Sequence, residues 1–144
     1  MIVIDRHSRQ IAVKALRDFV DGAISNKEYE RRYPQSRDDP ALREVYIQIW
    51  FLYSDVQTHF LTGKHAPNEE RSLFLERCIL FLKSDLEFQW PLQECHLWCG
   101  LLRLFGIRRI VARGKNEEMP IGDKEVWPFL NKTQYEQVRE GRFQ

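Results

Sequence analysis

The chain is predicted to be mainly α-helical, in the α+β class, with an N-terminal bundle of about four helices and a smaller mixed C-terminal portion that contains short strands. Three observations lead to this prediction. Before residue 85, apolar residues recur every three or four positions, which is the period of a helix with one buried face. Capping residues and helix breakers interrupt that pattern at intervals. After residue 85 the helical period fades and short alternating runs begin.

The first two helices are predicted from their capping residues. A helix over residues 8–21 has Ser8 as its cap, and Gly22 can take the left-handed conformation that ends it. A second, short helix follows Ser25, which lies three residues before Glu28 as in a capping box. The stretch LRDFVDGAISNKEYERRY resembles the short helical hairpins of many bacterial proteins. That resemblance implies an interaction element.

Two longer helices complete the predicted bundle. The third helix enters through Asp39 and Pro40 and runs to about His59. The fourth begins after Asn68, with acidic residues in its first turn, and ends near Ser84. The side chains expected to point inward from the fourth helix are Leu73, Phe74, Cys78, Leu80 and Phe81.

The mixed portion begins with LEFQW at residues 86–90, where apolar and polar residues alternate as in a strand with one buried face. IRRIVAR is predicted to be a strand because of its β-branched residues, and EVWPFL a strand or an extended segment packed by its aromatic residues. Residues 92–105 fit either a helix or extended chain. A final short helix is predicted up to Arg139, capped by Asn131 or Thr133.

Length and composition predict one domain over residues 1–144, with a helical part at 1–85 and a mixed part at 86–144. The net charge is +1, with 22 basic and 21 acidic residues, so no global field attracts nucleic acid or an anionic membrane. Three cysteines are too few for a disulfide framework. MIVIDRHSRQ lacks the apolar run of a secretory signal. We therefore expect a cytoplasmic protein with no membrane contact.

Two aromatic segments, FLKSDLEFQWP and EVWPFL, carry a resemblance to members of small bacterial protein families to which no activity is assigned. The resemblance is one of overall texture along the chain. It implies no activity, and no functional residue is transferred from it.

The segment LEFQWPLQECHLWCG holds sulfur and imidazole groups that zinc prefers as ligands. In a helix, Cys95 and Cys99 would share one face, whereas His96 would point about 100° away from Cys95. The other donors nearby in sequence are Cys78, His59 and His65. A metal site is the alternative here. We favour the cysteines as apolar core residues, and we expect no cofactor.

The segment LLRLFGIRRIVARGK is the most basic part of the chain, with Arg103, Arg108, Arg109 and Arg113 and no acidic residue between them. Such a surface can bind single-stranded nucleic acid. The acidic residues of NEE and GDKE follow directly, so intramolecular pairing or an acidic protein partner is favoured. Trp90 and Trp127 each precede a proline at a predicted element end, where they could meet a partner.

The sequence contains no nucleophile turn, phosphate loop or dinucleotide fingerprint, so an enzyme is disfavoured. The leading hypothesis is a small non-catalytic bacterial protein that binds another protein through the arginine and tryptophan residues named above, and an acidic protein is one such partner. One specific form is an immunity or antidote protein that blocks a toxin. The alternatives are a metal-binding protein and an RNA-binding protein that uses the basic segment.

Overall fold

The computed structural model describes residues 3–53, 56–91 and 122–141. Within these ranges the secondary structure is helical, and the predicted mainly helical class is confirmed there. The α-helices are α1 (Arg6–Val20), α2 (Asn26–Arg32), α3 (Pro40–Trp50), α4 (Glu69–Lys83) and α6 (Lys132–Arg139), and the short 3-10 helices are η1 (Gly63–His65) and η3 (Lys124–Val126).

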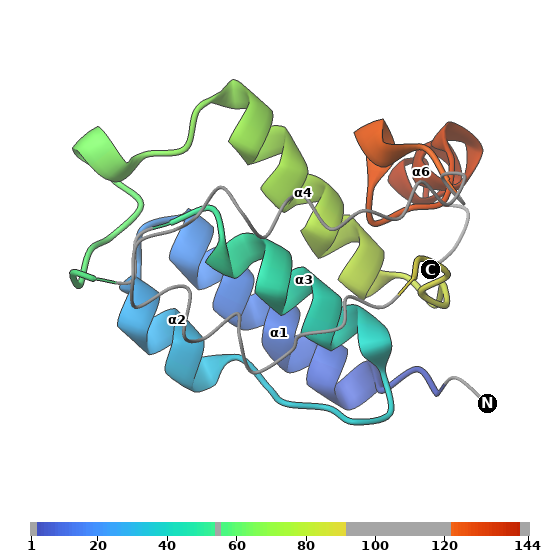
Figure 1. Cartoon of the computed structure of the whole chain (residues 1–144), viewed down its shortest axis with the longest axis horizontal. Coiled ribbons are helices and arrows are strands. Elements are labelled where there is room, and N and C mark those ends of the chain that lie inside the picture. Colours follow the sequence, from blue (N-terminus) through green and yellow to red (C-terminus); the bar gives the residue numbers. More distant parts are fainter. Residues whose placement is uncertain (1–2, 54–55, 92–121, 142–144) are drawn as a thin grey trace.

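Helix α1 is the centre of the N-terminal bundle, because it packs against α2, α3 and α4. Figure 1 shows α1 and α3 side by side, with α4 passing above them and α2 at one end. Helix α6 packs against α4 on the side away from the segment that joins α3 to α4 (Figure 1). The core therefore extends from the bundle through α4 toward the C-terminal helix.

The start of α1 differs from the prediction. Asp5, not Ser8, caps the helix, and the Asp5 carboxylate accepts a hydrogen bond of 2.9 Å from the Ser8 amide. A cap satisfies an amide two or three residues further on, so Ser8 provides the donor and the helix begins earlier. The predicted end is confirmed, since Gly22 has a φ of +72° in the left-handed region.

The other predicted helix caps are confirmed. Each cap side chain accepts a hydrogen bond from a backbone amide in the first turn of its helix. The capping residues are Ser25 for α2, Asp39 for α3, Asn68 for α4 and Asn131 for α6. Pro40 occupies the first turn of α3, where its missing amide hydrogen costs nothing.

Helix α3 ends at Trp50, so the prediction that it continues to about His59 was wrong. Val56 fits the helical period but is 86% exposed. Further along, the backbone of His59 pairs with Asn26 instead, through hydrogen bonds of 2.9 and 3.0 Å. These bonds come from a residue distant in sequence, so local periodicity contains no sign of them.

The predicted strand at residues 86–90 is also wrong, because this segment is irregular chain without a ladder. Its alternating burial is nevertheless real: Phe88 is buried, and Glu87 and Gln89 are exposed. EVWPFL is no strand either. It begins with η3, which Asp123 caps, and continues in turns. No strand occurs in the described ranges, and IRRIVAR and residues 92–105 lie outside them.

Helix α4 buries a face rotated from the predicted one. Cys78 and Phe81 are buried as predicted, and Phe74 and Leu80 are partly buried. Leu73 is 47% exposed, so its inward assignment was wrong, and Leu75 and Leu82 are buried instead. The run CILFL is apolar on several sides, so the period alone could not select the buried face.

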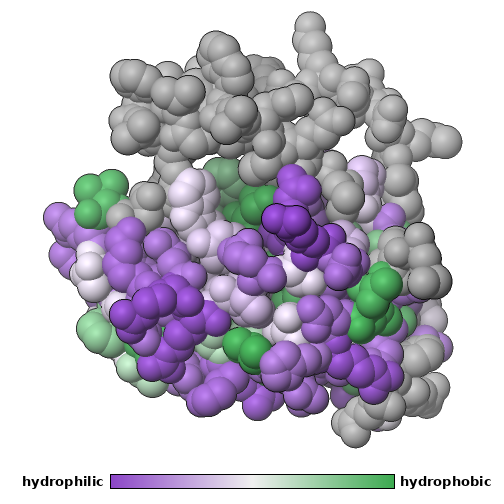
Figure 2. Space-filling view, turned by 90° about the horizontal axis from the view of Figure 1, so that it is seen from below, coloured by the Kyte–Doolittle hydropathy of each residue, from purple (hydrophilic) through white to green (hydrophobic). Residues whose placement is uncertain are grey.

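The surface of the described residues is mostly polar. Figure 2 shows one face on which hydrophilic side chains predominate and a few small apolar spots are scattered. Scattered exposed apolar residues are normal for a folded chain. None of the helices in the described part has the length and apolar character needed to cross a bilayer.

Candidate functional site

The arginine residues of the predicted partner surface, Arg103, Arg108, Arg109 and Arg113, lie outside the described residues. The two tryptophan residues of that surface are half-buried. Trp90 donates its indole N–H to the Phe129 carbonyl at 3.1 Å, and Trp127 stacks on Phe74 with ring centroids 5.5 Å apart. Both therefore have a packing role between α4 and the C-terminal residues, which leaves only part of each ring for a partner.

The metal alternative also falls mostly outside the described residues, since Cys95, His96 and Cys99 lie there. Cys78 is fully buried in α4, and burial raises the pKa of its thiol well above the ordinary value. A thiol that stays protonated is a poor metal ligand. In the described ranges, His, Cys, Asp and Glu side chains nowhere gather in a group of three that could hold a metal ion.

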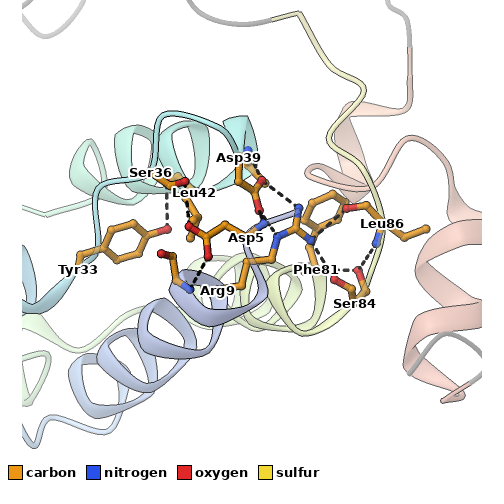
Figure 3. A network of polar contacts seen from close by, with 11 residues as sticks. Asp5, Arg9, Tyr33, Ser36, Asp39, Leu42, Phe81, Ser84 and Leu86 are labelled. Carbon is orange, nitrogen blue, oxygen red and sulfur yellow. Dashed lines mark hydrogen bonds and ion pairs between the residues drawn. The ribbon is translucent and has the colours of Figure 1, made fainter. Parts of the chain in front are cut away.

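A buried ion pair links α1 to the start of α3 and to the chain after α4 (Figure 3). Arg9 Nε lies 2.6 Å from Asp39 Oδ2, and Arg9 Nη2 lies 3.0 Å from Asp39 Oδ1. Arg9 Nη1 donates to the carbonyls of Ser84 and Leu86 at 2.9 and 3.0 Å. Asp39 also accepts two backbone amides. Because the buried charges are paired and hydrogen-bonded within the chain, this network has a structural role.

A pocket of about 220 Å³ lies where the bundle meets the segment that joins α3 to α4. Side chains from α1, α3 and α4 line its apolar part, and they include Phe19, Ile49 and Leu75. The basic side chains that line it are His59, Lys64, His65 and Arg71. No aspartate or glutamate is among its described lining residues. The three apolar residues are almost completely buried, so the accessible lining of the pocket is mostly polar and includes these basic groups.

Asn26 fixes one side of this pocket. Its side-chain oxygen accepts the His59 amide at 2.9 Å, and its side-chain nitrogen donates to the Gln57 carbonyl at 3.1 Å. The Asn26 amide donates to the His59 carbonyl at 3.0 Å. Asn26 is fully buried, so the first turn of α2 holds the joining segment against the bundle.

The two histidine rings are stacked, with centroids 4.4 Å apart. His59 Nδ1 lies 2.9 Å from the Gln57 carbonyl, which can only accept, so Nδ1 carries the hydrogen and Nε2 is the acceptor of the neutral ring. Desolvation lowers the pKa of His65 below its ordinary value of 6.5, and the neighbouring His59 and Lys64 lower it further. The lowered pKa keeps His65 uncharged at neutral pH, so Lys64 and Arg71 contribute positive charge there and His65 does not.

Lys64 and Arg71 are exposed and form no ion pair with the described residues. Elsewhere, basic side chains commonly pair with acids, as Lys14 does with Asp18 and Arg32 with Glu28. An unpaired cation beside a concave surface is a suitable binding group for an anion. We infer that the pocket is the candidate functional site.

Sequence reasoning missed this pocket. The available signal is the stretch HFLTGKHAP, which places three basic residues in nine positions without an acid. The sequence analysis considered the histidines of this stretch as metal donors and did not consider the stretch as an anion-binding surface. The apolar half of the pocket comes from three helices, so only the folded arrangement brings it beside the basic residues.

A scan of family models found no match to this chain, and comparisons with curated proteins and with solved structures found none either. The function must therefore be inferred from the geometry of the chain itself.

Proposed function

We propose that the protein is a non-catalytic module that binds another protein, and that an acidic group of the partner enters the basic pocket. The observation that supports this proposal is the position of Lys64 and Arg71, which lie unpaired within the described part of the chain at a pocket that no described acidic residue lines. Opposite charge at a rim favours encounter with an acidic partner and sets its orientation.

The size of the pocket favours a protein partner over a large cofactor. Pockets that enclose drug-sized ligands have volumes of about 300–1,000 Å³. The pocket here has a volume of about 220 Å³, which is suited to one inserted residue. Protein interfaces commonly place one anchor side chain in such a pocket and add weaker contacts around it.

The test is affinity selection from random dodecapeptides synthesised with free carboxyl termini, with the immobilised full chain as bait. We expect the retained peptides to be richer in acidic groups than the starting library. The Lys64→Glu/Arg71→Glu variant should lose this preference, because it reverses the charge at the pocket.

A matched control is the Lys83→Glu/Lys124→Glu variant, which makes the same charge change at two exposed residues that do not line the pocket. It should retain the same peptides as the wild type. Thermal unfolding of each variant checks that folding is preserved. Equal retention by both variants would refute the pocket as the binding site, as would a retained set without acidic enrichment.

A further inference from the structure

His65 is an accessible residue of the basic pocket whose charge depends on pH. Lysine and arginine side chains stay charged near neutral pH, whereas histidine titrates between about pH 5 and 8. His59 also lines the pocket but is only 7% exposed, whereas His65 is partly exposed, so a charged group of a partner reaches His65 more readily. Figure 1 shows η1, which contains His65, at the edge of the molecule and away from α6.

Contacts on two sides hold His65 at the pocket. Its ring stacks on that of His59, with the ring centroids 4.4 Å apart, and its backbone amide donates to the Thr62 carbonyl at 3.0 Å. His59 is in turn held by its hydrogen bonds with Asn26. The pocket has a volume of about 220 Å³ and is small compared with the Debye length of about 8 Å at physiological salt. An anion inside it therefore interacts with His65 as well as with the two permanent cations.

No described acidic side chain lines the pocket to offset a charge on His65. The titratable and charged side chains that line it beside His65 are Tyr53, His59, Lys64 and Arg71. Glu30 of α2 accepts a hydrogen bond of 3.2 Å from the Tyr53 hydroxyl but does not line the pocket. Glu69 and Glu70, in the first turn of α4, are exposed and do not line it either. A bound anion would therefore be the negative charge nearest to this part of the pocket.

An anion in the pocket changes the proton affinity of His65. Without one, desolvation and then the basic neighbours His59 and Lys64 lower the pKa of His65 below its ordinary value. An opposite charge nearby favours the protonated ring, so a bound anion raises this pKa again. The complex then binds more protons than the free chain, and linkage requires the affinity for the anion to rise as the pH falls. The gain begins below the pKa of the complex and is complete below the pKa of the free chain.

We propose that His65 is a pH sensor of the basic pocket. It is neutral at pH 7, takes up a proton when an acidic group of the partner binds, and makes binding stronger under mildly acidic conditions. This inference rests on the proposed function and names the regulation of its site.

The test measures binding of acetylated and amidated tetra-aspartate to the full chain by NMR titration at pH 7.5 and 5.5. These values lie on either side of the ordinary histidine pKa of 6.5, and the aspartate carboxylates stay ionised at both. We expect the dissociation constant to be about three- to tenfold lower at pH 5.5, because one unit of pKa change corresponds to a tenfold change in affinity. The NMR titration midpoint of the His65 ring should rise when the peptide is bound.

His65→Gln should remove the difference in affinity between the two pH values. His7→Gln is the matched control, since His7 lies on α1 and does not line the pocket, and it should keep that difference. Thermal unfolding at both pH values checks that each variant is folded.

An equal pH dependence in His65→Gln and the wild type would overturn the inference, as would an unchanged His65 midpoint. Weaker binding at pH 5.5 would also overturn it, and would mean that the charge on His65 instead repels its basic neighbours and disrupts the pocket. The proposed function fails separately: if acidic peptides bind with the same affinity at both pH values, an acidic partner still fits the pocket and only its pH regulation is wrong.

Discussion

Two tyrosine residues in the aromatic core differ in one hydrogen bond. Tyr29 and Tyr33 are both buried, and their rings are 5.5 Å apart. The Tyr33 hydroxyl donates to the Leu42 carbonyl at 3.0 Å. The Tyr29 hydroxyl is buried and has no hydrogen-bond partner among the described residues. Burial raises the pKa of both hydroxyls, so both stay protonated at neutral pH.

We expect Tyr29→Phe and Tyr33→Phe to change stability in opposite directions. Tyr29→Phe removes an unpaired buried hydroxyl and keeps the ring that stacks on Phe19, so it should raise the free energy of unfolding by about 1 kcal/mol. Tyr33→Phe removes a made hydrogen bond and should lower that free energy by about 1 kcal/mol. Urea denaturation measures both. A loss of stability in Tyr29→Phe would show that its hydroxyl is satisfied in solution.

At the residue scale, pairings between distant positions escaped sequence reasoning. Arg9 lies on the buried face of α1, and its partner Asp39 was predicted only as the cap of α3. A buried arginine is rare unless it is paired. The apolar pattern of the sequence contains no information about a partner 30 positions away. Asn26 is similar, because its role depends on residues 57–59, which fold back onto α2.

At the scale of elements, local signals predicted most helix starts correctly. A cap and the amide that it satisfies are within three positions, so sequence contains both. Errors arose where two nearby residues could serve, as with Asp5 and Ser8, or where the apolar period continued past the end of a helix, as in α3. The basic pocket depends on residues that are near one another in sequence and also on contacts between helices that are far apart in sequence. Its charged residues, Lys64 and Arg71, lie seven positions apart in sequence, whereas its apolar walls come from three separate helices.

The cap of α1 provides a pH-dependent prediction. A hydrogen bond from the Ser8 amide lowers the pKa of Asp5 below its ordinary value of 3.8, and further bonds from the Ser8 and Ser36 side chains add to this effect. A carboxyl with a lowered folded-state pKa stabilises the fold above its unfolded pKa. That contribution is lost as pH falls from about 3.8 through the folded-state pKa.

Asp5→Ala should therefore cost about 0.5–2 kcal/mol at pH 7, measured by urea denaturation. Asp5→Asn keeps a capping oxygen, so it should cost less, and its difference from the wild type should close as pH falls below 3.8. Ser8→Ala is the matched control and should cost less than Asp5→Ala, because the Ser8 amide remains. If Ser8→Ala costs more than Asp5→Ala at pH 7, the assigned cap is wrong.

At the scale of the whole molecule, the described C-terminal residues join the bundle through α4. Phe129 is fully buried, and its ring lies 5.2 Å from that of Phe81. Arg77 of α4 donates to the Trp127 carbonyl at 3.2 Å. These contacts give the described C-terminal residues and the bundle one shared core, and the single domain over residues 1–144 stays a prediction.

Phe129→Ala tests whether the two parts unfold together. Removing a buried phenylalanine should lower the free energy of unfolding by about 3–5 kcal/mol. If the chain is one cooperative unit, native-state hydrogen exchange should show a matching loss of protection in the slowest amides of α1 as well as α6. Leu73→Ala is the control at an exposed position of α4 and should have little effect. Loss of protection confined to α6 would mean that the C-terminal helix opens by itself while the bundle, with its pocket, stays folded.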